Sequence, residues 1–194
     1  MRVLKEQVNE LTDACKAKDS ALKRALQKLE YTTDDLDKMQ EKMKLSKNFS
    51  LVEFTKSQIA ERKGIYNYPT PAHQVSLRSL CTNVLQPVRD HFGRVVSVSS
   101  GYRSEELCLA IGSKVTSQHA KGQAADFEIF GLSNKELADW IHENLEYDQL
   151  ILEYWKEEDP NSGWVHCSYK SEGNRKQYLK AYKENGKTKY ENIL

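Results

Sequence analysis

The chain has 194 residues, a length that allows one ordinary domain with an appendage, or two small domains. Lysine and arginine total 29 and aspartate and glutamate total 28, so the formal net charge is +1 and no overall field favours nucleic acid or an anionic membrane. With 39% hydrophobic residues the composition is polar for a globule, but its 9% of aromatic residues is too high for a disordered polymer, which predicts a folded core.

Export and membrane insertion are not expected. The sequence has no apolar run of about 18 residues, and charges alternate at the N-terminus where a secretory signal would be apolar. We therefore expect a soluble chain made in a cytoplasm. Cys15, Cys81, Cys108 and Cys167 are scattered without a CxxC pair, which favours reduced thiols over a disulfide scaffold.

Residues 1–63 contain neither glycine nor proline, so helix can continue without interruption. Apolar positions from residue 4 to residue 43 recur at alternating spacings of four and three, which is the seam of a coiled coil. We predict a coiled-coil helix over 1–47 that self-associates or docks on another protein through residues 4–43. Lys18 and Thr32 weaken this seam, and the alternative is one amphipathic helix folded back on the domain.

The remaining sequence, 48–194, predicts an α+β domain with a mainly antiparallel sheet and flanking helices. Ser50 and Glu53 have the spacing of a capping box at the start of a short helix. An Asn185-Gly186 step predicts the tight turn of a hairpin. The predicted helices are 71–91, 105–111 and 133–145, and the predicted strands are 95–99, 124–130, 149–154, 164–169, 177–183 and 187–190.

Three segments concentrate side chains that can bind a metal: SQHAKGQAAD at 117–126, LILE at 150–153 and GWVH at 163–166. His119 is expected in a loop and Asp126 on the next strand, and Gly122 between them allows the chain to turn back. His166 on another strand would supply a third ligand. Two histidines and one carboxylate leave a coordination position open, as in catalytic zinc sites. On spacing alone, ordinary hydrogen-bonded side chains remain the alternative.

The motifs SSGYRS at 99–104, SQHAKGQAADFE at 117–128 and GWVHCSY at 163–169 follow one another in this order. Together they resemble the phage-type branch of the D-Ala-D-Ala carboxypeptidase metallopeptidases, the peptidase M15 family, whose fold is shared with the hedgehog signalling domain. The likeness extends from about residue 48 to residue 190 and includes the Asn174-Arg175 step and the hairpin. It implies a hedgehog/DD-peptidase-like fold and a zinc cofactor.

By this resemblance His119, Asp126 and His166 are the zinc ligands. Many members of the family carry the catalytic acid three positions before the last histidine, where this chain has Gly163. In the phage-type and hedgehog-like branches the acid lies on the preceding strand, and Glu153 matches that position. The resemblance therefore implies Glu153 as the catalytic base.

Other residues near the motifs have open roles. Three acids in a polar loop compete with Glu153 as the base: Glu157, Glu158 and Asp159. Arg103 matches the arginine of the SGYRS motif, implicated in binding a substrate carboxylate or polarising the scissile carbonyl, and a surface ion pair is its alternative. Ser117 and Gln118 are candidate substrate-binding residues that orient the ligand loop, or form only a structural turn.

The implied activity is hydrolysis of a D-amino-acid-containing bond in the stem peptide of bacterial peptidoglycan. A D,D-carboxypeptidase and an endopeptidase both fit. We expect a phage-encoded protein, made in the host cytoplasm, that acts on the cell wall either as a free lysin or from the virion. The competing hypothesis is a structural tail component whose domain binds metal and cell wall without catalysis.

Overall fold

The computed structural model describes residues 43–193 continuously and, before them, residues 7, 11, 15, 18, 19, 21–26, 29, 32, 35–38 and 41. The chain divides into two compact units, residues 1–43 and 44–194. The described residues of the first unit are helical, and about half of the predicted helix over 1–47 lies outside the described residues. Its predicted end is wrong, because residues 44–47 are not helical. Four leucines of the predicted seam are exposed by 57 to 68%: Leu11, Leu22, Leu29 and Leu36.

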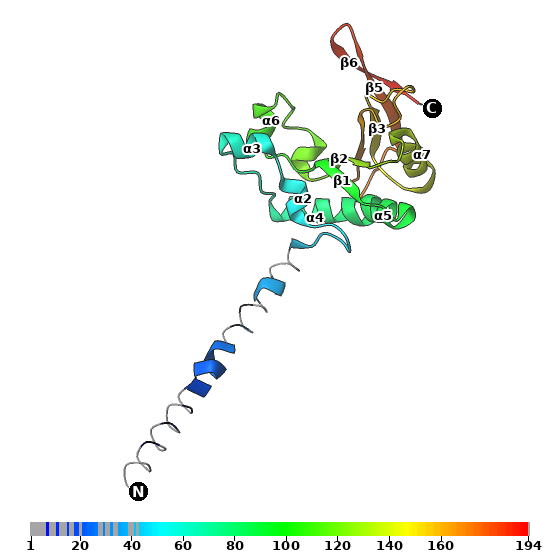
Figure 1. The fold of residues 1–194 in the computed structure, drawn as a ribbon. Coiled ribbons are helices and arrows are strands. Elements are labelled where there is room, and N and C mark those ends of the chain that lie inside the picture. The colour runs from blue at the N-terminus through cyan, green and yellow to red at the C-terminus, as the bar shows by residue number, and fades with distance from the viewer. Residues whose placement is uncertain are drawn as a thin grey trace. The chain divides into compact units, whose positions relative to one another are not determined.

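The second unit is an α+β domain with a six-stranded sheet in the order β1-β2-β4-β3-β5-β6 (Figure 1). Its strands are β1 (Val96–Ser100), β2 (Ala124–Ile129), β3 (Gln149–Glu153), β4 (Trp164–Ser168), β5 (Gln177–Glu184) and β6 (Lys187–Asn192). Its α-helices are α2 (Leu51–Thr55), α3 (Gln58–Lys63), α4 (Pro71–Leu80), α5 (Gln86–Phe92), α6 (Glu105–Ala110) and α7 (Asn134–Asn144). A π-helical turn, η1 (Cys81–Leu85), joins α4 to α5, and η2 (Gln118–Lys121) is a 3-10 turn.

The sheet is mainly antiparallel, as predicted, but it contains one parallel pair that the sequence does not predict. Strands β3 and β5 run parallel, whereas the other neighbouring pairs are antiparallel. Strand β4 follows β3 in the chain but lies between β2 and β3, so β5 must return to the free edge of β3. The loop between β4 and β5 stays at one end of the sheet and passes the start of β3, so β5 runs opposite to β4 and therefore parallel to β3. The predicted hairpin at Asn185-Gly186 joins β5 and β6.

The predicted helix over 71–91 is present but contains the π-helical turn before Pro87. Proline has no N–H to donate, and its ring would clash with the carbonyl of Asn83 in a regular α-helix. The π turn widens the helix at that point, and the N–H of Gln86 bonds to the Cys81 carbonyl. Thr70 caps the helix, and Gly93, in the left-handed conformation, ends it.

The two faces of the sheet differ in burial. One face carries side chains no more than 1% exposed, namely Phe127, Leu150, Leu152, Val165 and Cys167. Helix α7 packs against β2, β3 and β4, and its Asp139 accepts a hydrogen bond from Tyr178 of β5 (Figure 1). Successive residues of a strand point to opposite faces, so the residues between these core positions lie on the other face. Asp126, His166 and Glu153 are among them.

The capping box at the start of α2 is confirmed, because the Ser50 side chain accepts the backbone N–H of Glu53 and the Glu53 carboxylate accepts the backbone N–H of Ser50. The four cysteines, all described, are free. Among the residues that the structure describes, no helix combines the length and the apolar surface that a membrane crossing requires.

Candidate metal centre

Strand register places two of the predicted ligands next to each other. Asp126 of β2 pairs directly with His166 of β4, so their side chains project from the same face. Ser100 at the end of β1 pairs with Asp126 on its other side, after a bulge at Ser99. Bulges re-aim side chains beside functional sites, and this one brings the end of β1 and the following loop toward Asp126. Cys167 lies on the opposite face, as expected for the residue after His166.

His119 reaches the same place from η2, a 3-10 turn rather than the loop that the sequence suggested. The Ser117 hydroxyl accepts the N–H of His119 and so caps this turn. Gly122 ends the turn at φ 67°, and a Cβ there would lie 2.4 Å from the His73 carbonyl oxygen. The ring Nδ1 of His119 lies 2.7 Å from the carbonyl oxygen of Gly101 and donates to it. This bond directs the other ring nitrogen, Nε2, at Asp126 and His166.

The three predicted ligands converge. Nε2 of His119 lies 3.3 Å from both Nδ1 of His166 and Oδ1 of Asp126, and the latter two atoms are 2.8 Å apart. All three side chains are buried. Zinc–nitrogen bonds of about 2.0–2.1 Å in tetrahedral geometry would place two ligand atoms about 3.3 Å apart. The spacing of these donors therefore fits a single zinc ion.

The protonation states also suit a metal. Burial lowers the pKa of His119, which favours the neutral imidazole. Burial alone would raise the pKa of Asp126, but contacts with His119 and His166 outweigh it and hold that pKa well below its usual value. A neutral imidazole and an ionised carboxylate are the forms that bind a metal.

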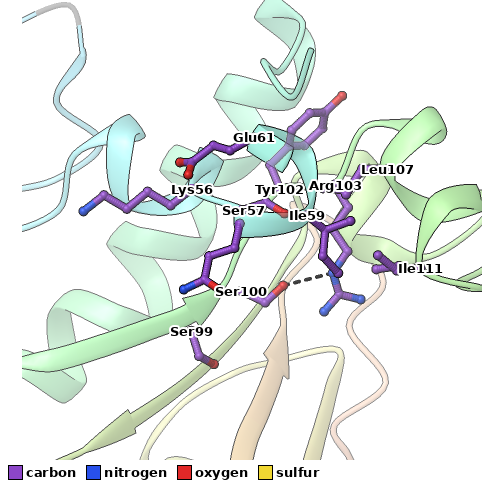
Figure 2. Close-up of a pocket in the computed structure, with 11 residues that line it drawn as sticks. Lys56, Ser57, Ile59, Glu61, Ser99, Ser100, Tyr102, Arg103, Leu107 and Ile111 are labelled. Carbon is purple, nitrogen blue, oxygen red and sulfur yellow. Dashed lines mark hydrogen bonds between the residues drawn. The ribbon is translucent and has the colours of Figure 1, made fainter. Parts of the chain in front are cut away.

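Arg103 contacts this centre directly. Its Nη2 donates to Oδ2 of Asp126 at 2.7 Å, and its Nε donates to the Ser100 hydroxyl at 2.9 Å, the bond drawn in Figure 2. The carboxylate partner of Arg103 is thus Asp126, rather than a surface acid beside it in sequence. This bond holds Oδ2, which leaves Oδ1 facing the two imidazoles.

Glu153 lies with the three candidate ligands on the lining of a cavity of about 630 Å³. Burial raises the pKa of Glu153, and the charge of Asp126 raises it further. The position three before His166 is closed to an acid, because a Cβ on Gly163 would lie 1.8 Å from the Glu153 carbonyl oxygen. The acids that compete for the role of base, Glu157, Glu158 and Asp159, are all exposed on the loop after β3.

A second cavity, of about 570 Å³, adjoins the first, since Arg103 lines both. Its lining includes the apolar side chains of Ile59, Leu107 and Ile111, and Figure 2 shows Ser100 on one side of the Arg103 guanidinium and Ile111 on the other. The metal centre therefore lies in a longer depression with polar and apolar parts.

Sequence reasoning missed several residues that line the first cavity. Gln149, Trp164 and Tyr190 come from three different strands, and Trp164 pairs directly with Glu153. Tyr190 joins them because β6 pairs with β5 and Ala181 of β5 pairs with Glu153. No local motif marks these residues, since only the strand order brings them together. Gln118, a predicted substrate residue, lines the cavity but donates its amide N–H to Asp148.

Comparison with known proteins supplies the family. A search of curated proteins finds no match to this chain. A family model described as Peptidase M15 matches residues 47–168, which include Arg103, Glu153 and the three candidate ligands. The match spans more than half of the chain and confirms the resemblance to the peptidase M15 family. The chain belongs to the peptidase M15 family.

Proposed function

We propose that the domain is a zinc peptidase that hydrolyses a D-amino-acid-containing bond of the peptidoglycan stem peptide. The observation that carries this proposal is the convergence of His119, Asp126 and His166 in one cavity with Glu153. The donor spacing and protonation states suit zinc with one position open to water. Membership of the peptidase M15 family supports the class of reaction. The substrate is inferred from the motif resemblance.

The residues divide the chemistry among them. His119, Asp126 and His166 would hold the ion, which when bound supplies an acidified water and polarises the scissile carbonyl. Glu153 accepts the proton of the attacking water and then donates it to the leaving amine. The raised pKa of Glu153 favours this second transfer, because a group that both accepts and donates a proton works best when its pKa lies near the working pH.

Arg103 fixes the orientation of Asp126 through Nη2. Nη1 is not engaged in the bonds to Ser100 and Asp126, and Arg103 lines the cavity. We infer that this part of the guanidinium stabilises the oxyanion that develops at the scissile carbonyl, or binds a substrate carboxylate. Both actions need a cation that is fixed before substrate arrives.

The proposal is tested by digesting purified muropeptides with the full chain and identifying the products by mass. We expect new peptide ends with added zinc, and none after chelation until zinc is restored. Glu153→Gln should bind zinc as the wild type does and lose at least about 100-fold in turnover. Glu158→Gln, a change of the same kind on the exposed loop, is the matched control and should retain activity.

The products also separate the two candidate reactions. Release of terminal D-Ala alone would identify a carboxypeptidase, whereas cleavage within the stem or a cross-bridge would identify an endopeptidase. If the zinc-loaded wild type binds sacculi and releases nothing, the domain is instead a metal-bearing wall-binding module. Unchanged turnover by Glu153→Gln would exclude Glu153 as the base.

We further propose that the protein is a phage lysin whose segment 4–43 associates with a second copy of the chain. The resemblance to the phage-type branch and the exposed seam leucines support this proposal. Mass spectrometry of purified particles tests attachment to the virion. A fixed number of copies per particle supports it, and absence from particles favours a free lysin.

A further inference from the structure

A second charged cluster lies beside the proposed metal centre, around Asp148. This carboxylate is 1% exposed and precedes β3. Arg175 donates to both of its oxygens, from Nε at 2.9 Å and from Nη2 at 2.7 Å, and Lys170 lies 2.9 Å from Oδ1. Gln118, next to His119, donates to Oδ2 at 3.0 Å. One buried anion thus holds two cations, which leaves the cluster with a surplus positive charge.

Arg175 is held before any ligand arrives. Its backbone N–H also donates to Asp148, and the preceding Asn174 exchanges two hydrogen bonds with the backbone of Lys170, which closes the loop. A guanidinium has five N–H groups, and the edge toward Asp148 uses only Nε and Nη2. Nη1 and the second hydrogen of Nη2 remain. The side chain is 53% exposed and lines the same cavity as the candidate zinc ligands.

Three side chains with a positive charge line the cavity, and Arg175 is the one best placed to bind a ligand. Arg103 also has Nε and Nη2 engaged, but its side chain is only 19% exposed and the proposed function places it at the scissile bond. Lys114 lies on an exposed stretch, where a flexible ammonium has to be ordered by its ligand. Arg175 presents a planar edge already fixed by a buried carboxylate, and such an edge matches a carboxylate ligand in bidentate fashion.

We propose that Arg175 is a specificity residue that binds a free carboxylate of the stem peptide away from the scissile bond. The inference rests on the proposed function, because the stem peptide has to be the substrate. Stem peptides carry such carboxylates on their D-glutamyl and diamino-acid residues, in free or amidated form. Asp148 acts as a positioning residue that fixes the guanidinium.

The test compares two synthetic stem peptides that differ only in a free or an amidated side carboxylate. We expect the zinc-loaded wild type to cleave the free form with a kcat/KM about tenfold or more higher, the range for hydrogen bonds to charged groups. Arg175→Gln should lose this preference and cleave the amidated peptide within about twofold of wild type. Isothermal titration gives a readout independent of turnover. The peptide with the free carboxylate is titrated into Glu153→Gln and into the double variant Glu153→Gln with Arg175→Gln. The double variant should bind it with a Kd about tenfold or more higher.

Two further variants keep the test decisive. Lys176→Gln removes the same charge one residue away, from a side chain paired with Glu146, and should keep the wild-type preference. If Arg175→Gln fails to fold because Asp148 is left short of partners, the double variant Asp148→Asn with Arg175→Gln removes both charges and carries the same expectation.

The outcomes separate the two proposals. If the wild type cleaves neither peptide, the proposed function fails. If the wild type cleaves both and the Arg175 variants keep the preference for the free carboxylate, or lose activity equally on both peptides, the role of Arg175 is overturned.

Discussion

Gly163 immediately precedes β4 and lies against the backbone of Glu153, the proposed base at the end of β3. It has φ 68°, and a Cβ would lie 1.8 Å from the Glu153 carbonyl oxygen. Gly173 has φ 67° with nothing within 4 Å of the same position. Both alanine variants therefore bear the strain of a left-handed residue, about 1–2 kcal/mol, but only Gly163→Ala adds a backbone clash. We expect Gly163→Ala to lower the free energy of unfolding, measured in urea, by at least about 3 kcal/mol more than Gly173→Ala.

Arg103 supports a second prediction at this scale, on metal affinity. Because it holds Oδ2 of Asp126, Arg103→Gln should weaken zinc binding by about 10–100-fold, the usual effect of losing the partner of a metal ligand. Competition with a chromogenic chelator measures this affinity. Lys114→Gln removes a positive charge from the lining of the same cavity and is the control. Equal zinc affinity in Arg103→Gln and wild type would leave Arg103 with a role toward substrate alone.

How far the residues of the centre could be predicted depends on whether a local motif marks them. His119, Asp126 and His166 stand in motifs, and the structure brings all three together. Asp148 has no motif, since an acid before a strand is ordinarily a surface residue, and only the fold shows that it is buried under Arg175. Tyr190 is brought to the cavity by strand order, which no short stretch of sequence encodes.

At the scale of elements, Asp148 connects three segments: the start of β3, the turn η2 through Gln118, and the loop that carries Arg175. Burial raises the pKa of Asp148, but hydrogen bonds from Arg175 and Lys170 outweigh this effect, so the pKa lies well below its usual value. The folded state keeps this carboxylate ionised at pH values where the unfolded chain, with a pKa of about 3.9, takes up a proton. Stability from this cluster is therefore complete above about pH 4 and is lost as the pH falls toward the folded pKa.

We expect Asp148→Asn to lower the free energy of unfolding, measured in urea at pH 7, by about 2 kcal/mol. Below about pH 4 the variant should lose less stability than wild type. Both proteins should be compared in chelator, so that acid release of metal does not contribute. Asp90→Asn, at a carboxylate that is 56% exposed, should change stability by less than about 0.5 kcal/mol. Parallel pH profiles for Asp148→Asn and wild type would contradict the assigned pKa direction.

Most elements could be predicted, because periodicity and end signals are local. The strands and the helices 71–91, 105–111 and 133–145 are present with small shifts of boundary. What local signals cannot supply is how strands pair, and the parallel pairing of β3 with β5 was accordingly not anticipated. Helix α3 also went unrecognised, since its six residues are too few to show a period.

At the scale of the whole molecule, the two units differ in how far their apolar side chains are buried. The unit from residue 44 buries its own core, which includes Leu45 and Phe49. Deletion of residues 1–43 should therefore leave the melting temperature, zinc affinity and turnover of soluble muropeptides within error of the full chain. A large fall in melting temperature would show instead that the first unit stabilises the second.

The first unit leads to the last prediction, on self-association. Exposed leucines at a spacing of four and three gain stability only by packing against another helix, so the full chain should be at least dimeric in light scattering and the deletion variant monomeric. Leu22→Glu places a charge in the seam and should dissociate the oligomer, whereas Lys23→Glu introduces the same side chain off the seam and should not. Because Leu22 is 60% exposed within its own unit, neither change should alter the melting of the second unit. If the full chain stays monomeric at micromolar concentration, the seam does not pair with a second copy and its partner is a different protein.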